Sequence, residues 1–165
     1  MTASITATKN TRQEHHIPCA EKLSKEEVLA FEFPDLVERL EDKLHLTPTE
    51  ARGLYRDLLE FLFLCGFHRG KGPFGPPEKI DNAWHEFLMF TRQYAEFCHK
   101  HFGSFIHHVP FTRRQKALGQ GPVNAARTAE LARREFGTLS SNWRAPAANC
   151  GKCSSCEGDC CPIHD

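Results

Sequence analysis

Hydrophobic residues recur at intervals of three and four through most of this chain, which is the spacing of an amphipathic α-helix. One helix is expected to begin at Pro34, and a longer one is expected over Pro48–Cys65, ended by Gly66. The longer helix has the stronger start signal, because Thr47 can cap it and Glu50 can complete a capping box.

The same spacing continues through residues 81–110, where aromatic and histidine side chains are concentrated. Trp84 lies on the apolar stripe and is expected to be buried. The pattern can break near Phe90–Thr91, with Thr91 as the cap of a second helix. Gly103 is a helix stop, and residues 105–110 are expected to turn the chain back towards the first helix.

No segment shows sustained period-two alternation, so strands are not expected. The sequence therefore predicts an all-α fold, an irregular bundle of about five or six helices. Three parts are expected: a flexible N-terminal arm over residues 1–20, a helical domain over 21–138, and a linker with a cysteine-rich, poorly ordered tail over 139–165.

The charge and hydropathy of the chain mainly exclude classes of protein. The 165 residues carry 21 positive and 21 negative side chains, with an isoelectric point near 7.1, so no strong nucleic-acid signal is present. No apolar run reaches the about 18 residues that a transmembrane helix needs. We expect a soluble cytoplasmic protein with a protein partner, and the sequence leaves its oligomeric state open.

Residues 81–110 contain a candidate metal site. Asp81 and His85 are four residues apart, so they share one face of a helix, where a carboxylate can orient an imidazole. Cys98 and His108 could join them if the second segment folds back, giving zinc-type ligands. The alternative is that Cys98 is a buried hydrophobic residue and His85 only hydrogen-bonds to Asp81.

The C-terminal tail contains a second candidate. Its cysteines follow a C-x2-C-x2-C-x3-C spacing, which can wrap one soft ion. We rank zinc or another soft metal first, a disordered extension second and an iron–sulfur cluster third, because the surrounding residues offer no apolar shielding. The four candidate ligands are Cys150, Cys153, Cys156 and Cys160.

These motifs resemble a known family. The pattern D-x-x-W-H, followed by Y-x-x-F-C, F-G and H-H-x-P, is similar to the signature of the glycine-rich domain-containing protein-like family. The resemblance implies a compact helical domain, often followed by a glycine- or cysteine-rich tail, and it implies no particular activity. The matching positions are Asp81, Trp84, His85, Tyr94, Cys98, Phe102, Gly103, His108 and Pro110.

Three hypotheses of function follow. The first is a small metal-binding or adaptor protein with a thiolate tail and a His/Cys site in its core. The second is a metal-dependent enzyme that uses His85, Cys98 and His108 as ligands, with Asp81 or Glu86 as general base. The third is a metal-free interaction module in which the motif only packs the core. An open coordination position beside a cleft would favour the enzyme.

Overall fold

A computed structural model describes residues 24–71 and 74–144. These residues form helices and contain no strand, which confirms the expected all-α class. They hold seven α-helices where about five or six were expected, and two of the seven have only five residues each. No helix in these ranges is long and apolar enough to cross a membrane. The elements are α1 (Lys25–Leu29), α2 (Pro34–Leu44), α3 (Pro48–Phe67), α4 (Glu78–Met89), α5 (Thr91–Phe102), α6 (Arg113–Ala117), α7 (Gln120–Phe136) and a 3-10 turn, η1 (Ser141–Trp143).

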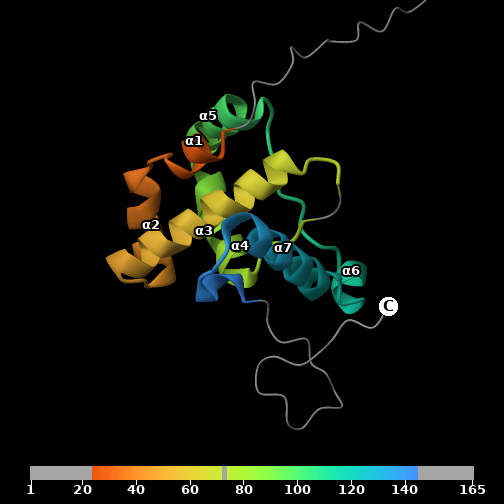
Figure 1. Ribbon diagram of the computed structural model, residues 1–165. Coiled ribbons are helices and arrows are strands. Elements are labelled where there is room, and N and C mark those ends of the chain that lie inside the picture. Colours follow the sequence, from red (N-terminus) through yellow and green to blue (C-terminus); the bar gives the residue numbers. More distant parts are fainter. Residues whose placement is uncertain (1–23, 72–73, 145–165) are drawn as a thin grey trace, which may run out of the picture.

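Helix α3 is the centre of the bundle (Figure 1). It packs against α1, α2, α4, α7 and η1, and its residues from Leu58 to Leu64 are all buried. A helix that is enclosed on several sides needs apolar residues around most of its circumference. Its start is the expected one, since Thr47 and Glu50 form a reciprocal capping box.

Gly66 does not end α3, which continues to Phe67. The expectation of a glycine stop was wrong because Gly66 serves a packing role. A Cβ atom at this position would lie 2.4 Å from the ring of Phe102, the last residue of α5. The missing side chain therefore lets α5 approach the end of α3.

We expect Gly66→Ala to lower the free energy of unfolding by about 1–3 kcal/mol, because the added methyl overpacks this contact. Gly53→Ala is the matched control. Gly53 lies in the same helix, and a Cβ atom there would meet nothing within 4 Å, so its substitution should raise stability by about 0.5–1 kcal/mol. Urea unfolding followed by circular dichroism measures both. Equal effects at the two positions would contradict the packing role of Gly66.

Helices α4 and α5 are separate, as expected, and the break lies at Phe90. Thr91 does not cap the second helix. It is the first helical residue, and the preceding Phe90 provides no side-chain cap. Gly103 ends α5 in a left-handed conformation with φ of 69°, as its position predicted.

The C-terminal end of the described chain is held by a buried carboxylate. Asp57 of α3 accepts hydrogen bonds from Ser140 Oγ at 2.7 Å, Asn142 Nδ2 at 2.8 Å and Trp143 Nε1 at 3.2 Å. Trp143 is only 3% exposed and belongs to the main core. The core therefore extends beyond residue 138, where the sequence pattern placed the end of the helical domain.

Glu60 lies one turn after Asp57 in the same buried region. Burial, helped by the charge of Asp57, raises the pKa of Glu60. Arg56 opposes this rise through a 3.5 Å ion pair with Glu60.

His101 lies in an aromatic cluster that joins α5 to the connection between α1 and α2. Its ring contacts Phe31, Phe97 and Phe102 at centroid distances of 6.0, 5.0 and 6.4 Å. Its Nε2 is buried without a hydrogen-bond partner among the described residues. Burial lowers the pKa of His101, Lys100 lowers it further, and Glu27 of α1 opposes the shift.

This lowered pKa has a defined effect on stability. As the pH falls, the unfolded chain binds a proton at His101 near the ordinary histidine pKa of about 6.5. The folded chain binds this proton only at a lower pH. The contribution is therefore fully present above that pH and is lost as the pH falls through the pKa of the folded state. We expect the melting temperature of His101→Phe to drop less than that of wild type between about pH 7.5 and about pH 5.5. His99→Gln, at an exposed position of the same helix, should keep the wild-type slope. If His101→Phe also keeps the wild-type dependence of melting temperature on pH, the conclusion that His101 is buried in its neutral form is wrong.

Candidate metal site

A short hydrogen-bond chain brings the segment after α5 against α4. Trp84 Nε1 donates to Tyr94 Oη at 3.0 Å, and Tyr94 Oη donates to the carbonyl of Ile106 at 2.7 Å. Trp84 and Tyr94 are buried on α4 and α5, so both are held by core packing. Only one residue separates Ile106 from His108, so this bond fixes that histidine beside α4.

Asp81, His85 and His108 meet at this point. His108 Nε2 donates to Asp81 Oδ1 at 2.8 Å, and His85 Nδ1 lies 4.0 Å from Asp81 Oδ2. The two imidazole rings are 4.5 Å apart between centroids, and the rings of Trp84 and His108 pack in an edge-type arrangement at a centroid distance of 4.5 Å. The expected return of residues 105–110 to the first helix is thus what the structure shows.

The spacing of this group is close to what one metal ion requires. One ligand atom from each residue can be chosen so that all lie within 4.8 Å of one another. In a tetrahedral zinc site with bonds of about 2.0–2.2 Å, ligand atoms are roughly 3.3–3.6 Å apart. The side chain of His85 is 50% exposed and that of His108 is 14% exposed, so small rotations of the freer His85 can close the difference. The donor set of two imidazoles and one carboxylate leaves coordination positions open.

Cys98 is not in this group. It is fully buried in the main core, beside Tyr94. Burial raises the pKa of the Cys98 thiol, which favours the neutral form over the thiolate that binds metal. Cys65 behaves in the same way, since burial strongly raises its pKa. The four tail cysteines, Cys150, Cys153, Cys156 and Cys160, lie outside the described residues.

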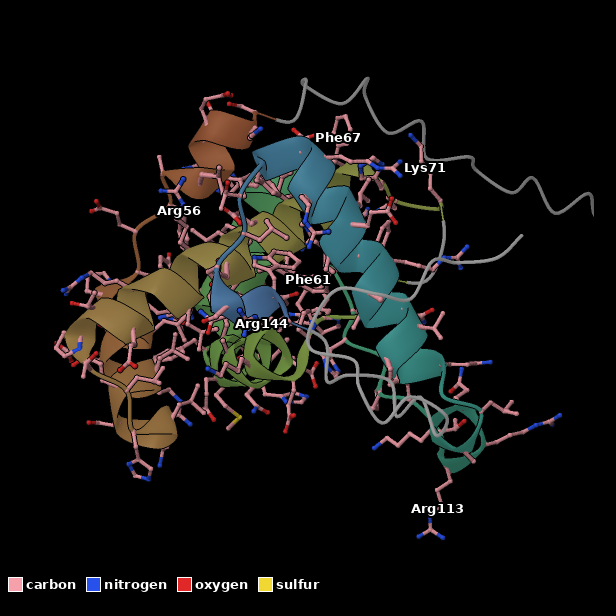
Figure 2. The ribbon with its side chains drawn as sticks, turned by 60° about the horizontal axis from the view of Figure 1, so that its bottom comes forward. Arg56, Phe61, Phe67, Lys71, Arg113 and Arg144 are labelled. Carbon is pink, nitrogen blue, oxygen red and sulfur yellow. The ribbon has the colours of Figure 1, made fainter. Side chains whose placement is uncertain are left out.

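The cluster opens into a cavity of about 710 Å³. Asp81, Trp84, His85 and His108 form one part of its wall. The remainder comes from α3, the segments before α4 and after α5, α6, and the start of α7. Figure 2 shows Phe61, one of the lining residues, inside the bundle, and Arg113 pointing outwards from α6.

The sequence did not assign two basic residues of the cavity wall to this site. Lys116 lies on α6, and Arg69 donates to the side chain and carbonyl of Ser104. The glycines around Arg69 suggest at most a phosphate loop, and nothing in the residue pattern shows that it shares a cavity with His108. Tyr94 belongs to the predicted buried stripe, but its bond to Ile106 has no sequence signal.

Glu86 was the alternative general base in the enzyme hypothesis. Its Oε2 lies 2.5 Å from Nε of Arg39 on α2. Its carboxylate therefore joins α4 to α2 and is not part of the cavity wall.

A family model described as UCP032817-like matches residues 24–127. The chain belongs to this family. The UCP032817-like match covers α1 to α6 and the whole candidate site, and it ends within α7. Its description names no activity, ligand or partner, and it does not support the glycine-rich family name suggested by the motif. No curated protein and no solved structure matches the chain.

Proposed function

We propose that this protein binds a divalent transition metal ion through Asp81, His85 and His108. The observation that supports this is the convergence of three ligand atoms within 4.8 Å. The scaffold is rigid on two sides, because Asp81 and His85 are one turn apart on α4 and the Tyr94–Ile106 bond holds the approach to His108. Because the backbone around the ligands is already in place, only side-chain rotations, mainly of His85, are needed when the ion binds.

The donor atoms narrow the choice of metal. Imidazole nitrogen suits zinc, copper, iron and nickel, and the carboxylate oxygen disfavours ions that require soft ligands. Zinc uses two histidines with a carboxylate in open sites, and non-haem ferrous iron uses the same two-histidine, one-carboxylate set. Both ions therefore fit the site at Asp81, whereas thiolate-dependent ions such as Cu(I) do not.

A second, soft-metal site in the tail remains part of the proposal. Its support is the spacing of Cys150, Cys153, Cys156 and Cys160, which allows one ion to take several thiolates. Together the two sites define a small helical metal-binding protein. The core site would coordinate through nitrogen and oxygen, and the tail site through sulfur.

Elemental analysis of the full chain, purified without oxygen, tests both sites. We expect about one equivalent of zinc or iron to be lost in the double variant His85→Gln, His108→Gln, because two of three ligands are removed. The matched control is His99→Gln and His107→Gln, which changes two exposed histidines of the same region. Replacing the four tail cysteines by serine should remove only the metal held by the tail.

The outcomes separate the hypotheses. Metal that survives the double variant but not the serine replacements assigns binding to the tail alone. If neither set of substitutions changes the metal content, both sites are wrong. Asp81 and His108 then form only a structural hydrogen bond, as in the interaction-module hypothesis.

A metal-dependent enzyme is a second candidate function, and the cavity is the observation that favours it. An ion with open coordination positions at the wall of a 710 Å³ cavity could polarise a bound substrate or activate water. Since Glu86 is paired with Arg39, a general base would have to come from a residue that lines the cavity.

A further inference from the structure

We propose that the cavity beside the Asp81–His85–His108 group takes a small organic carboxylate with an apolar body, whose carboxylate end binds at the metal. This proposal rests on the proposed function, because the ion is the anchor. It adds the chemical class of the ligand, which neither the residue pattern nor the family match indicates.

The size and walls of the cavity indicate a small organic molecule. Its volume of about 710 Å³ lies within the range of about 300–1,000 Å³ that is typical of small-molecule sites. Most of its wall is apolar, including Phe61, Trp84, Phe105, Ile106 and Phe111. Such a wall stabilises a bound hydrocarbon or aromatic group, and it provides little stabilisation for a fully hydrated ion such as free phosphate.

The charges of the wall indicate an anion. Arg69 and Lys116 are the basic residues of the wall, and Glu78 and Asp81 are the acidic ones. These charges balance before metal binds, so a divalent ion leaves the cavity with a net positive charge. A ligand carboxylate lowers this net positive charge and can occupy an open coordination position.

The polar groups lie on different parts of the wall. Asp81, His85 and His108 mark the metal end, while Lys116 comes from α6 and Arg69 from the segment after α3. Trp84 lies between the metal end and the apolar part of the cavity, because its ring lines the cavity and also packs on His108. A ligand that binds the ion therefore has an aromatic surface directly beside its carboxylate.

The test uses the full chain loaded with zinc, with 4-phenylbutyrate as the probe and 4-phenylbutyramide as its neutral counterpart. Two-dimensional ¹H–¹⁵N NMR follows the indole resonance of Trp84 and the amides of Phe105 and Ile106. We expect phenylbutyrate to shift these resonances in a saturable way, with the amide at least about tenfold weaker, because it lacks the charge. Removing zinc with a chelator should lower the affinity for phenylbutyrate by a similar factor.

Substitutions test the contribution of the wall charges. Lys116→Gln and Arg69→Gln should each lower the affinity for phenylbutyrate several-fold and leave the zinc content unchanged. Arg113→Gln is the matched control, since Arg113 lies on the same helix as Lys116 but points outwards (Figure 2).

The results distinguish this proposal from the one on which it rests. If zinc binds but the acid and the amide bind equally, or neither binds, the carboxylate proposal is overturned and the metal site stands. The same conclusion follows if phenylbutyrate affinity is indifferent to zinc. If zinc itself does not bind at Asp81, His85 and His108, the proposed function fails and the metal-anchored ligand fails with it.

Discussion

Trp84→Ala is expected to lower the free energy of unfolding by about 3–5 kcal/mol, the usual cost of truncating a core tryptophan. Trp84 is 5% exposed and packs on Phe61 at a centroid distance of 5.3 Å. Its loss also leaves Tyr94 Oη without the indole donor. Urea unfolding followed by far-ultraviolet circular dichroism measures the change.

The conservative variant Trp84→Phe separates packing from hydrogen bonding. It keeps an aromatic ring and removes the N–H, so we expect it to retain more stability than Trp84→Ala. A Trp84→Ala protein that unfolds at the wild-type urea concentration would show that Trp84 does not support the core.

Ending the chain after Ser141 is expected to be similarly damaging, with a loss of about 3–5 kcal/mol, because Trp143 leaves the core. The truncation also removes two of the three donors that satisfy the buried carboxylate of Asp57. A buried carboxylate that loses most of its hydrogen-bond donors adds its own penalty. Ending the chain after Arg144 keeps every one of these contacts and should leave the stability close to that of the full chain.

Comparing the two truncated chains by thermal melting isolates the contribution of residues 142–144. A large loss of stability in both chains would place essential contacts beyond Arg144. Equal stability of both chains and the full protein would instead show that the bonds to Asp57 contribute nothing.

Much of the fold could be predicted from the sequence because it depends on local signals. The capping box at Thr47, the proline start at Pro34 and the glycine stop at Gly103 act within one helical turn. The prediction at Gly66 was wrong because the role of this residue depends on Phe102, which is distant in sequence. The burial of Trp143 depends in the same way on Asp57, an acidic residue that a hydrophobic pattern does not mark as a partner.

The candidate site was predictable in part for the same reason. Asp81 and His85 are related by helical spacing alone, and the glycine at 103 indicated that His108 returns towards them. Whether Cys98 or Asp81 faces His108 depends on the angle between α4 and α5, which the break at Phe90 sets. No residue pattern encodes that angle, so Arg69 and Lys116 could not be assigned to the cavity either.

The sequence distances of these contacts also bear on the order in which the chain folds. The bonds from Trp84 to Tyr94 and from Tyr94 to Ile106 span 10 and 12 residues, so little loop entropy opposes them. The bond from Trp143 to Asp57 spans 86 residues and closes only after α3 and α7 are in place. The candidate metal site is thus built on a hairpin of helices that we expect to form early. We expect the contacts to Asp57 to close the bundle last, and amide hydrogens near η1 to exchange through local opening while those of α3 stay protected.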